Sequence, residues 1–353
     1  MPTPPLKGIQ VVEFTHVVMG PLVGKVLQSL GAEVLHVEPP GGDPTRRMQG
    51  FGKGFFTFYN NGKQTEEVDL KSDAGQTRIH KVLAKADVLI ENYGPGVLDK
   101  LGLGADAIRE RYPNLIYCTL KGFLPGPYEN RIAVDEIVQM MGGLAYMTGE
   151  PGKPSRAGTS ALDITGGLFG VIGILAALYE RKETGQGKIV HASLFESSAY
   201  LMGQFMAGFP LNENLEKATI NPMPAREQIW AIYQLFRTAD DKQIFIGVIS
   251  DKHWVSLCLA FGWHDLLKDE RWLSGAGRLE GQMELVTEIE HRLSSIPYSS
   301  IIESCLRENV PFGEVNSPLD LISNEHLTSG YLEEALTQKN EHVRIPCLPL
   351  LLR

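Results

Sequence analysis

The fold class of this chain is decided by residues 9–37, IQVVEFTHVVMGPLVGKVLQSLGAEVLHV. It opens with Ile9–Phe14, an apolar and β-branched run that predicts a buried strand. Helical spacing follows over Pro21–Leu30, and a second β-branched run follows at Glu33–Val37. A strand, a helix and a second strand in close succession predict two parallel strands joined by a crossover helix.

The same alternation of strands and helices continues through the first half of the chain. Further strands are expected at Glu66–Leu70, Asp87–Ile90, Leu115–Leu120 and Ile189–Ser193. Helices are expected at Asp73–Ala86, Val97–Leu101, Ala105–Tyr112, Asp135–Gly142, Ile164–Arg181 and Glu196–Ala207. This order predicts an α/β domain with a largely parallel sheet covered by helices on both faces.

The second half of the chain changes character after a polar stretch. Asn212–Glu227 contains two prolines and is typical of a linker. Ile229–Ile249 predicts a β-hairpin around Asp240–Asp241, and helical patterns follow it. We therefore expect a large domain over 1–210, a linker over 211–227, a small α+β domain over 228–315, and a return segment to the large domain over 316–353.

Composition and charge exclude several classes of protein. The net charge of −9 and the pI near 5.6 argue against nucleic-acid binding, which favours a basic surface. The four cysteines are widely spaced and show no zinc-binding pattern, so no metal site is expected. The N-terminus lacks the features of a signal peptide, and the apolar run Ile164–Tyr179 is short and contains four glycines, which favours a buried helix over a membrane span. A cytoplasmic enzyme without a membrane partner fits these observations.

Ligands of open parallel sheets bind beyond the carboxyl ends of the strands. Here those positions carry Thr15-His16-Val17, Glu38-Pro39-Pro40, Glu91-Asn92-Tyr93-Gly94 and Lys121-Gly122. Basic residues gather in the same loops: Arg46, Arg47, Lys53, Lys63, Lys71, Lys100 and Lys121. This pattern indicates either a site for an anionic ligand or a solvated charged face. The turn after the first strand reads THVVMGP and lacks GxGxxG, so an NAD enzyme is not expected.

Asp163 stands before a long apolar helix that contains no other charge until Glu180. It is either an N-cap or a reactive group, and a helix N-terminus would keep its carboxylate ionised near neutral pH. Glycines 166, 167, 170 and 173 fall three or four residues apart and predict a smooth helix face for close packing. His16 can be a base or a ligand, although a lone histidine is more often a hydrogen-bonded structural residue.

Several segments in order resemble the family III CoA-transferases, which include formyl-CoA and carnitine CoA-transferases. The resemblance rests on LKGIQVVEFTHVVMGP, LGAEVLHVEPPGGDPTR, ADVLIENYGPGVLDKLGL, the Asp163 segment, FRTADDKQIFIGV with KHW, DERW with Arg278, and VPFGEVNSPLDLISNEHL. It implies a Rossmann-like large domain, a small α+β domain, and ring-like monomers that interlock as a homodimer.

The resemblance also implies a site and a mechanism. Asp163 would attack an acyl-CoA thioester to form an aspartyl mixed anhydride. CoA would then form an enzyme thioester, from which a carboxylic acid acceptor takes it. Coenzyme A is thus a substrate, and no prosthetic group is implied. The residues implied to contact CoA are His16, Val17, Lys71, Asn92, Tyr93, Lys100 and Lys121.

Departures from the family pattern leave details of substrate and length open. Pro39 replaces a basic residue that some members carry, and INPMPARE (220–227) lacks the glycine run of formyl-CoA transferases. Family chains usually continue beyond the position of Arg353. Arg156 or Arg46 could pair with the second carboxylate of a dicarboxylate substrate.

Two other functions stay open at this point. A 2-methylacyl-CoA racemase shares the fold and the aspartate but needs a histidine just before a second aspartate, and here Val134 precedes Asp135. Because valine cannot transfer a proton, the transferase is favoured. A non-catalytic CoA-binding paralogue is the other alternative, and the presence of Asp163 argues against it.

Overall fold

The computed structural model describes residues 3–208, 221–223 and 229–352. The chain forms two compact units, one made of Met1–Ala225 with His326–Arg353 and the other of Arg226–Glu325. The second unit ends at Glu325 rather than at the predicted residue 315, and the C-terminal segment belongs to the first unit. Most of the predicted linker, 211–227, lies outside the described residues.

A six-stranded parallel sheet is the centre of the described part of the first unit. Its strands, in spatial order, are β3 (Gln64–Glu67), β2 (Glu33–Glu38), β1 (Gln10–Phe14), β4 (Val88–Glu91), β5 (Ile116–Lys121) and β6 (Ile189–Ser193). The prediction of a parallel α/β sheet is thereby confirmed. The strand order reverses between β1 and β4, which makes the loops after these two strands neighbours.

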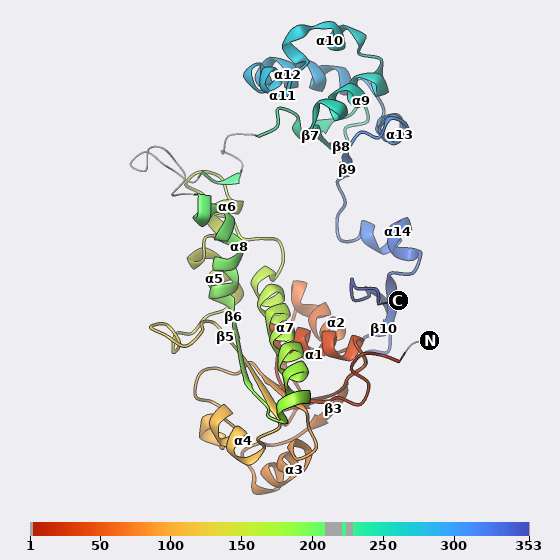
Figure 1. Cartoon of the computed structure of the whole chain (residues 1–353). Coiled ribbons are helices and arrows are strands. Elements are labelled where there is room, and N and C mark those ends of the chain that lie inside the picture. The colour runs from red at the N-terminus through yellow and green to blue at the C-terminus, as the bar shows by residue number, and fades with distance from the viewer. Residues whose placement is uncertain (1–2, 209–220, 224–228, 353) are drawn as a thin grey trace. The chain divides into compact units, whose positions relative to one another are not determined.

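Helices cover both faces of this sheet (Figure 1). On one face, α1 (Met19–Ser29) and α7 (Ala161–Thr184) share a buried apolar cluster with the inward side chains of β1, β2, β4 and β5. On the other face, α3 (Asp73–Leu83) and α4 (Ala105–Arg111) bury Ile79, Leu83 and Ile108 against the alternate strand residues. Successive strand residues thus enter opposite cores, as side-chain alternation requires.

The glycines of α7 allow its close approach to α1 and β6. A Cβ atom at Gly173 would lie 2.4 Å from Val190 Cγ1 of β6, and one at Gly167 would lie 2.7 Å from Leu22 Cδ2 of α1. The expected smooth helix face is therefore confirmed as core packing. By length and composition α7 could also span a membrane, a property that core helices of large domains share.

Three predicted elements have different bounds in the structure. The predicted helix at 97–101 is a short 3₁₀ turn, Asp99–Leu101, because the preceding Gly94-Pro95-Gly96 segment occupies a turn. The third strand in sequence lies at Gln64–Glu67 instead of 66–70. The helix expected from Ile164 begins at Ala161, so Asp163 is inside its first turn and is not its N-cap.

The remaining described helices of the first unit are α2 (Phe55–Asn60), α5 (Asp135–Met141), α6 (Leu144–Thr148), α8 (Leu194–Gly208) and α14 (Glu325–Thr328, which spans the boundary between the units). The C-terminal hairpin, β10 (Leu332–Leu336) and β11 (His342–Pro346), is tied to α1 by a Lys25–Glu333 ion pair of 2.6 Å. It thus adds a second, two-stranded sheet to the first unit.

The second unit is a small α+β domain with its own core. The antiparallel strands β7 (Tyr233–Arg237), β8 (Gln243–Gly247) and β9 (Phe312–Glu314) confirm the predicted hairpin. Five helices pack around this sheet among the described residues: α9 (Asp251–Phe261), α10 (His264–Lys268), α11 (Gly275–Glu280), α12 (Gln282–Leu293) and α13 (Tyr298–Glu308). Trp254, Phe236 and Ile289 are fully buried in its centre.

Candidate active site

A pocket of about 400 Å³ lies at the carboxyl end of the parallel sheet. It opens next to the point where the strand order reverses, between β1 and β4, which is the usual ligand site of open α/β sheets. Most of the predicted site residues line this pocket: Asp163, His16, Val17, Asn92, Tyr93 and Lys121. Residues far apart in the sequence thus meet at one edge of the sheet.

The loops after β1 and β4 are joined by one side chain. Asn92 Oδ1 accepts a hydrogen bond of 3.0 Å from the His16 backbone N–H, and Asn92 Nδ2 donates one of 2.9 Å to the His16 carbonyl. Because both bonds go to the backbone of His16, its side chain remains available to the pocket. Its Nδ1 is buried and has no hydrogen-bond partner among the described residues, which differs from the hydrogen-bonded structural histidine that the residue type favours.

Burial lowers the pKa of His16 below its usual value. The imidazole is therefore neutral at pH 7, and it can accept a hydrogen bond from a ligand. Its ring centroid lies 5.6 Å from that of Tyr93. The two rings line the same pocket as Asp163.

Val17 has a left-handed backbone conformation, with a φ of 65°. This conformation is costly for a β-branched residue and is often found at functional sites. The Val17 N–H donates a hydrogen bond of 3.0 Å to Thr45 Oγ1. The bend turns the chain from the end of β1 into α1 while its side chain lines the pocket.

Asp163 lies in the first turn of α7, and another carboxylate caps that helix. Asp135 Oδ2 accepts hydrogen bonds from the backbone N–H groups of Leu162, at 2.7 Å, and of Asp163, at 2.8 Å. Its Oδ1 accepts a hydrogen bond from Gln139 Nε2. Asp135 therefore satisfies two free N–H groups of the helix, a function that Asp163 would have had as an N-cap.

The carboxyl group of Asp163 has neither a hydrogen bond nor an ion pair within the described part of the chain. Burial, with the negative charges of Asp135 and Glu136 adding to it, raises the pKa of Asp163 to about 7. The expectation that the helix N-terminus keeps this carboxylate ionised near neutral pH is thus wrong, because a large fraction of it is protonated at pH 7. Burial and two neighbouring carboxylates outweigh the favourable helix N-terminus.

Lys121 follows β5 and contacts the loop that bears Tyr93. Its Nζ lies 2.7 Å from the Glu91 carboxylate and donates a hydrogen bond of 2.6 Å to the Tyr93 carbonyl. Its charge is therefore neutralised by the protein, and its visible function is to hold this loop. Thr119 also donates to Glu91, so the carboxylate is well satisfied.

Lys71 and Lys100 do not line the pocket. Both are exposed on neighbouring loops, Lys71 after β3 and Lys100 in the 3₁₀ turn after β4. Gln76 Nε2 donates to the carbonyls of Leu70 and Leu101, which joins the two loops. The two lysines thus border the same sheet edge at its surface, away from Asp163.

Comparisons with known proteins show which family the chain belongs to. A profile of CoA-transferase family III matches residues 6–353. The chain belongs to CoA-transferase family III. The acetyl-CoA:oxalate CoA-transferase of Acetobacter aceti is 34% identical over 324 residues, 88% of this chain and 81% of that protein. The succinate–glutarate CoA-transferase of Agrobacterium fabrum is 33% identical over 332 residues, 89% of this chain and 80% of that one.

A solved structure has the same fold. The crystal structure of a CaiB/BaiF family protein from Brucella suis matches with a TM-score of 0.86 at 29% identity, covering 99% of this chain and 93% of that one. The protein is thus a CoA-transferase by family, and its α/β architecture is that of solved CaiB/BaiF relatives.

Several residues in the pocket or near its carboxylates were not singled out from the sequence as site residues of this CoA-transferase. In the sequence, Asp135 served only to argue against a racemase, because Val134 precedes it. Its contact with the first turn of α7 depends on helix packing. Tyr59 is buried close to both carboxylates; burial, then Asp163 and Asp135, raise its pKa to about 12, so it stays protonated. Arg131 lines the pocket from an exposed loop that the pattern of strands and helices does not mark.

The two arginines proposed from the sequence to hold a substrate carboxylate are both paired. Arg46 forms a two-pronged contact with Glu38, at 2.8 and 2.5 Å, and does not line the pocket. Arg156 lies 3.5 Å from Glu136. Arg46 is thus a structural cation of this transferase, and Arg156 is paired with a carboxylate that lines the pocket.

Proposed function

We propose that the protein moves CoA from an acyl-CoA thioester to a carboxylic acid through a covalent bond to Asp163. The observation that supports this most is an unpartnered carboxylate facing a pocket, with a pKa raised to about 7. A carboxylate of that pKa is a better nucleophile than an ordinary aspartate and is still ionised in part at pH 7. Its position on the first turn of a rigid helix fixes its direction.

The proposed reaction has two acyl transfers in each half. An oxygen of Asp163 attacks the thioester carbonyl and the C–S bond breaks. The CoA thiolate departs, and the acyl group is then joined to Asp163 as a mixed anhydride. The thiolate then attacks the Asp163 carbonyl of that anhydride, releasing the donor acid and leaving CoA on the aspartate. The acceptor carboxylate attacks this thioester, and the thiolate attacks the acceptor's carbonyl in the new anhydride, which restores Asp163.

The first turn of α7 does not supply oxyanion donors. The N–H groups of Leu162 and Asp163 bind Asp135, and those of Ala161 and Ile164 bind the carbonyls of Thr159 and Ser160. Donors for the tetrahedral intermediates must therefore come from other groups around the pocket or from the substrate. The pocket's apolar lining, with Met48, Phe51 and Phe55, would limit attack by water on the anhydride.

A steady-state assay tests this function against its two alternatives. We expect the protein to convert one acyl-CoA into another when a donor from a panel of acyl-CoAs and a free carboxylic acid are both present, as chromatography would show. Racemisation of a 2-methylacyl-CoA with deuterium uptake, but without transfer, would support a racemase instead. Binding of CoA with neither reaction would support a non-catalytic paralogue.

Among the described residues that line the pocket, Arg131 is the cation available for a substrate carboxylate. Its guanidinium stacks 4.7 Å from the Tyr128 ring and 5.8 Å from the Phe123 ring, and it forms no ion pair with any described residue. Because Asp135, Glu136 and Asp163 line the same pocket, a second carboxylate on the substrate would need a cation there. The succinate–glutarate relative acts on such acids, which supports a dicarboxylate substrate.

Replacing Arg131 with glutamine is expected to lower kcat/KM for succinyl-CoA by about 10- to 100-fold, the loss of one charged hydrogen-bonded contact. Activity with acetyl-CoA should change by less than about threefold, because that donor lacks the second carboxylate. The matched control, Arg156→Gln, removes an arginine that is already paired. Equal losses for both donors in Arg131→Gln would mean that Arg131 contacts CoA itself, and the dicarboxylate proposal would fail.

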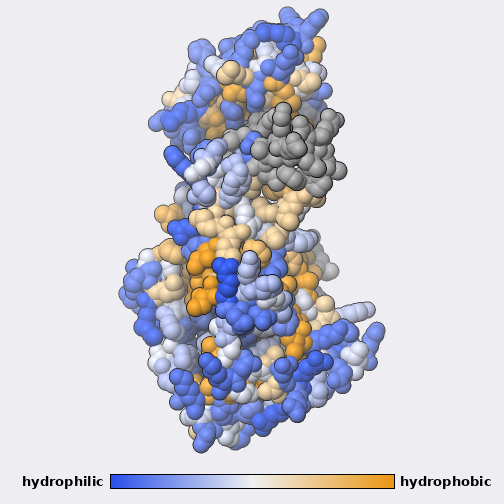
Figure 2. Space-filling model, turned by 90° about the vertical axis from the view of Figure 1, so that its left-hand side faces the viewer, coloured by the Kyte–Doolittle hydropathy of each residue, from blue (hydrophilic) through white to orange (hydrophobic). Residues whose placement is uncertain are grey.

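We also propose that the protein is a homodimer that buries an apolar face of the first unit. The exposed side of α7 bears Leu168, Ile172 and Tyr179, and α8 bears Tyr200 and Met206. Figure 2 views the side on which α5, α6 and α8 lie and shows hydrophobic side chains gathered there. A face of this kind commonly marks a protein interface. Light scattering at micromolar concentration is expected to give the mass of a dimer, and a monomeric mass would refute this proposal.

A further inference from the structure

Thr45 connects the strained turn of the pocket with a buried polar network. Asp43 Oδ1 accepts hydrogen bonds from both the N–H and the hydroxyl of Thr45, each of 2.7 Å. Since the hydroxyl proton points to Asp43, the lone pairs of Thr45 Oγ1 are free to accept the 3.0 Å bond from the Val17 N–H. Both Asp43 and Thr45 are almost fully buried, so water does not compete for these bonds.

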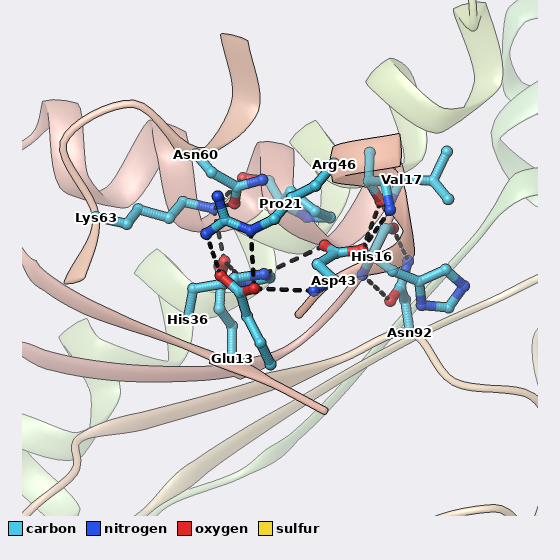
Figure 3. A network of polar contacts seen from close by, with 12 residues as sticks. Glu13, His16, Val17, Pro21, His36, Asp43, Arg46, Asn60, Lys63 and Asn92 are labelled. Carbon is cyan, nitrogen blue, oxygen red and sulfur yellow. Dashed lines mark hydrogen bonds and ion pairs between the residues drawn. The ribbon is translucent and has the colours of Figure 1, made fainter. Parts of the chain in front are cut away.

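Further charged groups fix the orientation of Asp43 (Figure 3). Its Oδ2 lies 3.3 Å from His36 Nε2, and His36 Nδ1 lies 2.8 Å from Glu13 Oε1. Lys63 Nζ donates to the same Glu13 oxygen at 2.6 Å. Although burial alone would raise the pKa of Asp43, hydrogen bonds from His36 and Thr45 hold it below the usual range. Asp43 therefore stays an acceptor for Thr45.

The backbone of Val17 needs such a restraint. Its φ of 65° is a conformation that valine adopts only where the surrounding structure enforces it. Asn92 holds the preceding residue, His16, through two hydrogen bonds, and Thr45 holds Val17 itself. If Val17 relaxed to an ordinary φ, the chain between β1 and α1 would take another direction. His16 and Val17, which lie in this segment, both line the pocket.

We infer that Thr45 is a positioning residue for substrate binding, whose hydroxyl, oriented by Asp43, holds Val17 in the left-handed conformation that shapes the pocket for CoA. This inference rests on the proposed function, because it takes CoA as the ligand of the pocket. Thr45 does not line the pocket, so its effect on CoA would pass through the backbone of Val17.

The test replaces Thr45 with valine, which keeps the shape and removes the hydroxyl. We expect the Kd for free CoA, measured by calorimetry, and the KM for acetyl-CoA to rise about 10-fold, the effect of one buried hydrogen bond, while kcat changes by less than about twofold. Thr45→Ser keeps the hydroxyl and should restore binding to within about threefold of the wild type. Thr287→Val, in the second unit, is the matched control and should bind CoA normally.

Val17→Gly separates positioning from general stability. Glycine adopts a positive φ without strain, so it does not need the bond to Thr45. When Thr45→Val is added to the Val17→Gly variant, it should therefore weaken CoA binding by less than about twofold, instead of about 10-fold. Thermal unfolding of each variant shows that the proteins compared are folded.

The outcomes distinguish this inference from the proposed function. Wild-type protein that binds CoA while Thr45→Val binds it as tightly overturns the inference alone. An equal loss from Thr45→Val in the wild type and in the Val17→Gly variant also overturns it, because the effect would then not pass through the turn. Wild-type protein that binds CoA but transfers none refutes the proposed function and leaves the binding test valid. Wild-type protein that binds no CoA refutes both.

Discussion

Asp163→Asn is expected to lower the rate of CoA transfer by at least about 10³-fold with every donor and acceptor, because an amide cannot form the anhydride. The side chain keeps its size, and the two bonds from Asp135 go to the backbone of α7, so the fold should persist. Binding of free CoA should change by less than about threefold, since the lost step is chemical. A variant that retains more than about a tenth of the transfer rate would rule out Asp163 as the nucleophile.

The same substitution should stabilise the protein at neutral and higher pH. The pKa of Asp163 is raised from 3.8 to about 7, so between these values the unfolded chain loses a proton that the folded protein keeps. The free energy of unfolding of the wild type therefore falls as pH rises from about 4 to about 7. Asparagine removes this loss, and we expect about 1–3 kcal/mol of extra stability at pH 8 and little at pH 4.

Urea unfolding of both proteins at pH 4 and pH 8 measures this effect. An advantage of Asp163→Asn in stability that grows with pH fits a buried carboxyl group whose ionised form is unfavourable in the folded protein. A difference of the opposite sign, with the wild type more stable at pH 8, would mean that Asp163 is a stabilising helix anion.

Changes at Asp135 are expected to have the second largest effect. Asp135→Ala leaves the buried N–H groups of Leu162 and Asp163 without their acceptor, which should cost about 1–3 kcal/mol of stability and misplace Asp163. Asp135→Asn keeps an acceptor for the helix but removes the negative charge beside Asp163. The pH at which the transfer rate rises, as Asp163 becomes ionised, should then be lower by about one pH unit.

A compensated variant keeps these hydrogen bonds and moves the negative charge from residue 135, which binds the backbone of Asp163, to residue 139, which does not. In Asp135→Asn the new amide N–H₂ would meet the Nε2 group of Gln139, two donors facing each other. Adding Gln139→Glu restores an acceptor there and still lets Ala157 N–H find an oxygen. We expect this double variant to recover stability, while its transfer rate still rises at a lower pH than that of the wild type. Single-turnover acylation measured from pH 5 to 9 shows the shift, and an unchanged pH dependence would mean that Asp135 does not set the pKa of Asp163.

The parallel sheet and the place of the site were predictable from the sequence. Runs such as Ile9–Phe14 identify buried strands through composition alone, and the loops after parallel strands must meet at one edge. His16 and Asn92 therefore met as expected, although the sequence does not state that the amide of Asn92 would bind the backbone of His16.

The environment of Asp163 was not predictable in the same way. Its pKa depends on Asp135, which comes from another helix whose packing no local pattern specifies. The same carboxylate stabilises the start of α7 at Ala161. Asp135 accepts hydrogen bonds from N–H groups of the first turn, which have no partner within the helix. The left-handed backbone of Val17 likewise depends on Thr45, a residue on a separate loop.

The central claim is that Asp163 carries the transferred group covalently, and intact-mass spectrometry with hydroxylamine tests it most directly. Wild-type protein and Asp163→Asn are each mixed with acyl-CoA donors, treated with hydroxylamine and weighed. Because hydroxylamine converts an aspartyl anhydride or thioester to a stable hydroxamate, we expect a donor-dependent mass increase in the wild type and none in Asp163→Asn. A wild-type mass that stays unchanged with every donor that the protein turns over would contradict the account.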